Sequence, residues 1–139
     1  MRSGINVIQA SLDAGLRMFA DAMFDTVVLS QTLQAMHNAE GILRAMARVA
    51  RQGVVSFPNF GHWRHAVSLL AGRMPVTRHI PYQWYDTPNI HLCTLKDFEV
   101  LAAKVGLNIT GRAVFANGSS VKMLPTLRAA LAVYRFETR

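Results

Sequence analysis

The chain has 139 residues, of which 51% are hydrophobic and 17% are charged, so it can bury a core and is too apolar for a disordered protein. Its apolar runs are too short to cross a bilayer, its N-terminus lacks the apolar run of a secretory signal, and its single cysteine excludes an internal disulfide, so we expect a cytoplasmic protein with no membrane partner. The net charge of +7 is spread thinly without a nucleic-acid-binding motif, so no nucleic-acid partner is expected, and that function would rest on charge alone.

The N-terminal part of the chain predicts two β-strands. Residues 5–8 form a short β-prone run, and a turn or short helix follows near Gly15. Residues 26–29 are apolar and β-branched without alternation. That pattern is typical of a strand buried on both faces of a parallel sheet.

A βαβ unit is predicted over residues 26–57. Asn38 is the expected N-cap of a helix, and Gly53 is the expected residue at its end. A second buried strand follows at 54–57 and is stopped by Pro58. Strand, helix and strand in this order predict a parallel pair with a right-handed crossover.

Two histidines precede and begin the next predicted helix. His62 and His65 are three residues apart and could share a metal ion, but no third ligand stands at a suitable spacing. Ordinary histidines are therefore favoured over a metal site, and no catalytic residue is predicted. Trp63, Val67 and Leu70 lie on one face of this helix, which is expected to end at Gly72.

An irregular, aromatic-rich segment spans residues 75–95. It contains three of the five prolines and two of the three tyrosines, and its prolines exclude a long helix. Such segments in compact domains are usually functional loops, although a loop held in place by its own aromatic side chains is the alternative. Together with residues 59–64 it predicts a substrate or partner surface, with the candidate residues Asn59, His62, Trp63, Arg64, Tyr82, Trp84, Tyr85, Asp86, Asn89 and His91.

The C-terminal part completes an α/β pattern. Its expected elements are a helix that begins with a capping box of Thr94 and Asp97 and ends at Gly106, a strand at 107–115, a turn at Asn117–Gly118, a helix at 121–131 interrupted at Pro125, and a strand at 133–136. The whole pattern predicts one α/β domain over residues 1–139, with a mostly parallel sheet in a three-layer sandwich.

Several long stretches resemble the MetW family of bacterial methionine biosynthesis proteins, namely residues 24–25, 28–36, 56–64, 72–76 and 81–93. The resemblance covers nearly the whole chain and is weakest from Ala116 onward. It implies a doubly wound, Rossmann-like fold of the class I S-adenosylmethionine-dependent methyltransferase type. It also implies an accessory role to the homoserine O-acyltransferase MetX in the first step of methionine synthesis from homoserine. The alternative is an S-adenosylmethionine-dependent methyltransferase of unknown substrate.

The chain departs from this family at the cofactor site. Full-length members begin with a strand, a glycine-rich loop and a helix, followed by a second strand that ends in an acidic residue, and no Gly-x-Gly occurs in these 139 residues. We therefore expect the C-terminal part of the complete fold, without its first two strands, as a fragment, a truncated gene product or a shortened expression product. S-adenosylmethionine or S-adenosylhomocysteine is possible in a full-length parent, whereas neither cofactor nor catalysis is expected for this chain alone.

The resemblance implies that one wall of the cofactor pocket remains. Its residues would be Ser11, Leu12 and Asp13 beside the adenine, and Ser30, Gln31 and Leu33 beside the amino-acid part and the sulfur. The alternative is that these residues are only strand ends and turns. The missing neighbouring strands would leave the strand at 27–29 with an open edge, so we expect it to pair with another chain, to accept residues 5–8, or to cause aggregation.

Overall fold

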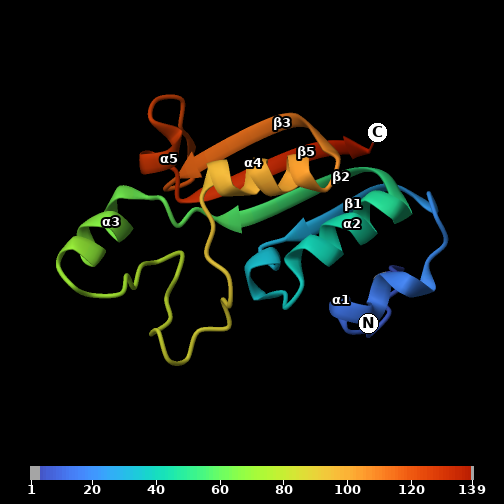
Figure 1. Cartoon of the computed structure of the whole chain (residues 1–139), viewed down its shortest axis with the longest axis horizontal. Coiled ribbons are helices and arrows are strands. Elements are labelled where there is room, and N and C mark those ends of the chain that lie inside the picture. Colours follow the sequence, from blue (N-terminus) through green and yellow to red (C-terminus); the bar gives the residue numbers. More distant parts are fainter. Residues whose placement is uncertain (1–3, 139) are drawn as a thin grey trace.

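The computed structural model describes residues 4–138 and contains one five-stranded sheet with helices against it (Figure 1). The strands, in the spatial order β1-β2-β5-β3-β4, are β1 (Phe24–Ser30), β2 (Ala50–Pro58), β5 (Leu131–Thr138), β3 (Leu107–Ala116) and β4 (Ser119–Ser120). The helices are α1 (Leu12–Gly15), α2 (Ala39–Val49), α3 (Trp63–Leu70), α4 (Leu95–Lys104) and α5 (Pro125–Arg128), with 3₁₀ turns at Leu16–Met18 and Leu33–Ala35.

The predicted βαβ unit is confirmed, because β1 and β2 pair in parallel with α2 between them. The Oδ1 atom of Asn38 accepts a hydrogen bond of 2.8 Å from the backbone N–H of Gly41, as an N-cap should. The predicted end of this helix is wrong, however. The helix ends at Val49, and Gly53 lies inside β2 opposite Phe136. A Cβ atom on Gly53 would collide with the Phe136 ring, so this glycine provides room for a core side chain rather than ending a helix.

The prediction of a mostly parallel sheet is also wrong. Only the β1–β2 pair is parallel, whereas β2–β5, β5–β3 and β3–β4 are antiparallel. Asn117 and Gly118, with φ of 50° and 78°, form the predicted turn between β3 and β4. β5 returns through α5 and lies between β2 and β3. The two-residue turn can join β3 and β4 only as an antiparallel pair, since a parallel pair needs a long crossover.

The core lies between α2, α4 and one face of the sheet. At its centre the rings of Phe57, Phe98 and Tyr134 are in mutual contact, with centroids 4.7 to 5.9 Å apart. Figure 1 shows α2 and α4 side by side in front of the strands. On the opposite face of β1, Val28 remains 64% exposed. β1, which was predicted at residues 26–29 to be buried on both faces, is thus buried on one face. The α/β, Rossmann-like fold class is confirmed.

The predicted N-terminal strand at residues 5–8 is not present. This segment has no regular structure, and Ile5, Val7 and Ile8 are 73%, 67% and 61% exposed. β1 is an edge strand, and no strand within residues 4–138 pairs with its outer side. Residues 5–8 therefore do not fill that position. Pairing of this edge with another chain stays a prediction, because a single chain does not test it.

The predicted helix at residues 121–131 is largely wrong. Only Pro125–Arg128 are helical, and Pro125 begins this helix rather than interrupting one. Leu131 instead starts β5, where it pairs with Pro58 of β2 and Phe115 of β3. Strand pairing on both sides thus overrides a local helical pattern. Among the helices of residues 4–138, none has the length and apolar character that a membrane span requires.

The close approach of Phe136 to Gly53 gives a stability prediction. Gly53→Ala should lower the free energy of unfolding by about 1 to 3 kcal/mol, because the new Cβ overpacks the core against the Phe136 ring. The matched control is Gly111→Ala in β3, where a Cβ would meet only ordinary contacts with Arg135 at 3.7 and 3.8 Å. Urea unfolding followed by circular dichroism measures both. Equal stabilities of the two variants would contradict the prediction.

Candidate functional site

The segment after β2 begins with a buried amide. Asn59 is 0% exposed, so its predicted place in a substrate or partner surface is wrong. Its Nδ2 atom donates hydrogen bonds to the carbonyl oxygens of Thr126 and Ala129, at 2.8 and 2.7 Å, and its Oδ1 atom accepts one from Gly61 N–H at 3.0 Å. Asn59 therefore joins the carboxyl end of β2 to α5.

His65 connects α3 to the loop that follows it. Its side chain is buried, with Nδ1 at 2.9 Å from the carbonyl oxygen of Phe60 and Nε2 at 3.3 Å from Oγ1 of Thr77. The carbonyl can only accept, so Nδ1 carries the proton and Nε2 accepts the Thr77 hydroxyl. Burial is the main cause that lowers the pKa of His65 below its usual value, and the ring therefore stays neutral at pH 7.

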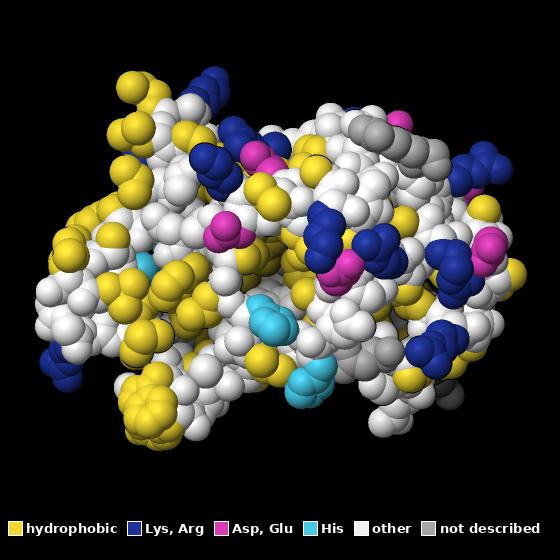
Figure 2. All heavy atoms as spheres, in the orientation of Figure 1, with side chains coloured by type: hydrophobic (Ala, Val, Ile, Leu, Met, Phe, Trp, Pro, Cys, Tyr) yellow, Lys and Arg dark blue, Asp and Glu magenta, His cyan; other side chains and the backbone are white. Residues whose placement is uncertain are grey.

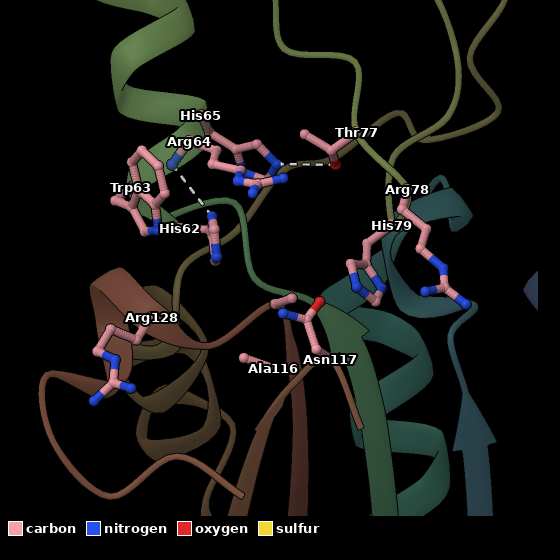
Figure 3. Close-up of a pocket in the computed structure, with 11 residues that line it drawn as sticks. His62, Trp63, Arg64, His65, Thr77, Arg78, His79, Ala116, Asn117 and Arg128 are labelled. Atoms are coloured by element: carbon pink, nitrogen blue, oxygen red, sulfur yellow. Dashed lines mark hydrogen bonds between the residues drawn. The ribbon is translucent and has the colours of Figure 1, made fainter. Parts of the chain in front are cut away.

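His62 begins α3. Its Nδ1 atom accepts a hydrogen bond of 3.2 Å from the backbone N–H of Arg64, which makes it the N-cap (Figure 3). Burial, followed by the nearby His65, Arg64 and His79, lowers the pKa of His62. Both histidines thus hold protein partners through at least one ring nitrogen. Within residues 4–138 no group of three potential metal ligands gathers anywhere.

An exposed apolar surface runs over α3 and the aromatic segment. Trp84 and Tyr85 are 71% and 69% exposed, and their rings meet edge to face with centroids 5.6 Å apart. Figure 2 shows hydrophobic side chains gathered on this side of the molecule. We call this the aromatic surface, and its exposed members are Trp63, Val67, Leu70, Val76, Tyr82, Trp84, Tyr85 and Ile90.

The aromatic segment, residues 75–95, is attached to the rest of the protein mainly through non-aromatic side chains and backbone hydrogen bonds. Ile80 is buried, its N–H and carbonyl pair with Thr77, and Thr77 contacts His65. At the other end the N–H of His91 donates to the carbonyl oxygen of Gln34 at 2.9 Å. Between these attachments Asp86 is exposed and Asn89 is half-buried. A loop held by its own aromatic side chains is therefore not what the structure shows.

Cys93 lies partly buried against the core. Burial, with a smaller contribution from Asp97, raises the pKa of its thiol to about 12. A thiol in this state is a poor nucleophile, which agrees with its interpretation as a small buried hydrophobe.

The carboxyl ends of β1 and β2 meet at the predicted cofactor residues. Gln31 has a left-handed backbone, with φ of 47°, and its N–H donates to the carbonyl oxygen of Ser56 at 2.9 Å and to Ser56 Oγ at 3.1 Å. Ser30 and Gln31 are exposed, whereas Leu33 is only 5% exposed and packs in the core. Leu33 also lines a small apolar cavity of about 230 Å³ together with His91 and Cys93, and this cavity does not include Ser30 or Gln31.

Of the other predicted cofactor residues, Leu12 lines a cavity of its own. Ser11 and Leu12 are exposed at the start of α1, and the Asp13 side chain lies outside what the structure describes. A cavity of about 130 Å³ beside Leu12 is closed by Asn38, Gly41 and Ile42, and it does not include Ser30, Gln31 or Leu33. The structure thus does not bring the two groups together around one space that fits a nucleoside cofactor.

A larger cavity was not predicted from the sequence. It has a volume of about 350 Å³ and lies where four segments meet, and it is lined by His62, Trp63, Arg64, His65, Thr77, Arg78, His79, Ala116, Asn117, Arg128 and Ala130 (Figure 3). His62, Trp63 and Arg64 were predicted as surface residues. No sequence pattern links them to Arg78, His79 or Arg128, because the fold alone brings these segments together.

The neutral state of His65 gives a pH prediction. Its folded pKa lies below the usual 6.5, so the unfolded chain binds more protons as the pH falls below 6.5, and the stability due to neutral His65 is lost there. We expect unfolding free energy to fall between pH 7.5 and about pH 5, and to fall less in His65→Asn, which keeps a donor towards Phe60. Urea unfolding at a series of pH values measures this. The exposed His37→Asn should behave as the unchanged chain, and an equal fall in His65→Asn would contradict the assignment.

Residues 1–136 match the family described as "Methionine biosynthesis protein MetW". A "Bifunctional methionine biosynthesis protein MetXA/MetW" from Rhodopirellula baltica is 37% identical over 110 residues, which are 76% of this chain and 17% of that protein. The chain thus spans less than a fifth of this curated relative.

Solved structures of methyltransferases share the fold. A S-adenosylmethionine-dependent methyltransferase from Mesorhizobium loti superposes with a TM-score of 0.66 at 15% identity, over 99% of this chain and 71% of that one. A possible histamine N-methyltransferase from Thermotoga maritima gives 0.66 at 12%, over 98% and 65%. The magnesium protoporphyrin IX methyltransferase of Synechocystis, with S-adenosylhomocysteine bound, gives 0.58 at 15%, over 95% and 50%. With this fold and the match over residues 1–136, the chain belongs to the MetW family of methionine biosynthesis proteins.

Proposed function

We propose that this chain supports a homoserine O-acyltransferase of the MetX type by binding to it, in the first step of methionine synthesis from homoserine. The observation behind the proposal is the exposed pair of Trp84 and Tyr85, which projects from a loop attached at both ends. Tyrosine and tryptophan are enriched among the residues that dominate binding energy in protein interfaces.

The aromatic surface has the composition of an interface. Trp63, Trp84 and Tyr85 supply large flat groups with polar edges, and Arg64 lies 5.5 Å from the centre of the Trp63 ring. Exposed apolar residues that gather in one patch indicate a binding surface, whereas single exposed residues carry no such meaning. Attachment through Ile80 and His91 lowers the conformational entropy that the loop would lose on binding.

The relative from Rhodopirellula baltica supports the choice of partner. Its name joins MetXA and MetW in one bifunctional protein. Two proteins that act together as separate chains are often found joined in this way, since a covalent link raises their effective concentration. On this basis we propose that a MetX-type protein is the partner of this chain.

A methyltransferase is the second candidate, and the shared fold favours it. In that fold the carboxyl ends of β1 and β2 would face the cofactor, with Ser30 and Gln31 at the edge of its site. The chain has no Gly-x-Gly sequence, and its candidate residues do not share one cavity. We therefore derive no methyl-transfer step for this chain.

The partner proposal is tested by substitution in the loop. Trp84→Ala and Tyr85→Ala should each raise the dissociation constant for the homoserine O-acyltransferase of the same organism by about tenfold or more, as expected for a binding hot spot. Surface plasmon resonance with the immobilised acyltransferase measures this, and acyl transfer to homoserine is assayed in parallel.

The control is Val100→Ala on α4, where Val100 is 64% exposed but lies outside the aromatic surface. It should leave binding and acyltransferase activity unchanged. If Trp84→Ala and Tyr85→Ala behave like this control, the aromatic surface is not the interface.

The second candidate has its own test. We expect S-adenosylmethionine to bind the isolated chain weakly or not at all, because the hydrogen bonds of a glycine-rich loop and an acidic residue are missing and charge-assisted bonds contribute about 1.5 to 3 kcal/mol each. Isothermal titration calorimetry measures the affinity. A micromolar dissociation constant would contradict this prediction without affecting the partner proposal.

A further inference from the structure

The small apolar cavity of about 230 Å³ lies among residues that follow the carboxyl end of β1. It is lined by the 3₁₀ turn at Leu33–Ala35, the start of α2, the end of the aromatic segment and α4. A hydrogen bond from His91 N–H to the carbonyl oxygen of Gln34 joins two of these segments, and Figure 1 shows the chain rising from there to the start of α4. Ligands bind outside the carboxyl ends of strands in open α/β sheets, so the position suits a ligand site.

The lining of this cavity is apolar and carries little charge. The Cys93 thiol stays protonated at pH 7, since burial raises its pKa to about 12. The Asp97 carboxylate already accepts a hydrogen bond of 2.8 Å from the Thr94 hydroxyl, and no lysine or arginine of the described residues lines the cavity. An anionic ligand would therefore meet a carboxylate and no positive partner. The apolar walls come from Leu33, Ala39, Phe98 and Leu101.

The side chain of Gln34, which also lines the cavity, holds an acceptor without a donor. Its Nε2 atom donates a hydrogen bond of 2.8 Å to the carbonyl oxygen of Gln31. This bond fixes the orientation of the amide, because the reversed amide would place two acceptor oxygens against each other. The Oε1 atom is buried, and no group among residues 4–138 donates to it. A buried acceptor in this state is costly, so it favours a ligand that brings a donor.

The size and the walls of the cavity favour a small organic molecule over water. A buried water needs several polar partners, and apolar walls do not supply them. A cavity of about 150 Å³ with apolar walls binds benzene, whereas pockets for larger ligands begin at about 300 Å³. A volume of about 230 Å³ therefore suits one ring with a few further atoms.

We propose that this cavity binds a neutral small molecule that has one apolar ring and a single O–H or N–H donor, with the donor bonded to Gln34 Oε1 and the ring against Phe98 and Leu101. The site shares no residue with the aromatic surface, and it does not include Ser30 or Gln31. The inference therefore goes beyond the proposed function, since this ligand requires neither the acyltransferase nor a methyl transfer.

Phenol is the probe, and toluene is the matched ligand of similar size without a donor. Both are titrated into the complete chain and into Gln34→Met, whose thioether is only a weak acceptor. Ligand-observed nuclear magnetic resonance measures the dissociation constants. The ratio of the toluene constant to the phenol constant should fall about tenfold or more in Gln34→Met, because only phenol loses a hydrogen bond to a buried group. An unchanged ratio would overturn the assignment of Gln34 Oε1.

A cavity-filling variant and the spectrum of the unchanged chain locate the site. Ala39→Leu adds bulk to the lining and should weaken phenol binding about tenfold or more, whereas Ala103→Leu, at an exposed position of α4, should change it by less than about twofold. In the unchanged chain phenol should shift the side-chain amide signals of Gln34 and leave those of the exposed Gln83 in place. The proposal is overturned if phenol does not bind, if the Gln34 signals do not move, or if Ala39→Leu binds phenol as Ala103→Leu does.

Discussion

The position of the aromatic surface and that of the cavity of about 350 Å³ both depend on the buried side-chain amide of Asn59. It holds the end of β2 to α5 through two donated hydrogen bonds and turns the chain at Gly61 through an accepted one. The same segment continues into α3, where His65 holds Thr77 and therefore the start of the aromatic segment. Arg128 at the end of α5 lines the cavity of about 350 Å³, so the position of that side of the cavity also depends on this amide. An unsatisfied buried carbonyl or amide is costly, and this cost fixes the arrangement.

Elements with strong local signals could be predicted from the sequence. The Asn38 cap, the capping box of Thr94 and Asp97, and the turn at Asn117–Gly118 depend on residues within a few positions of one another, and the structure contains all three. The family could also be predicted, because long stretches of sequence identify it. The role of a residue could not be predicted where it depends on a partner far away in the sequence. Gly53 was predicted to end a helix, because the sequence does not show that it lies opposite Phe136 in the sheet.

In the candidate site, too, features that depend on nearby residues could be predicted, and contacts between distant residues could not. The exposure of Trp84 and Tyr85 agrees with the predicted surface, whose function remains a proposal. Asn59 was assigned to that surface as part of residues 59–64, whose aromatic and arginine side chains are typical of binding surfaces, but α5 covers it and its amide is buried. Arg78 and Arg128 were not selected at all, since fifty positions separate them and only the return of β5 through α5 brings them to one cavity.

The two attachments of the aromatic segment have a consequence for how the protein evolves. Ile80 fixes one end and His91 the other, and no described contact with the core depends on the length of chain between them. Doubling the length of a flexible loop costs only about 0.6 kcal/mol. Insertions, deletions and exchanges around Trp84 are therefore tolerated by the sheet, so descendants of this chain can change this exposed surface while they inherit an unchanged scaffold.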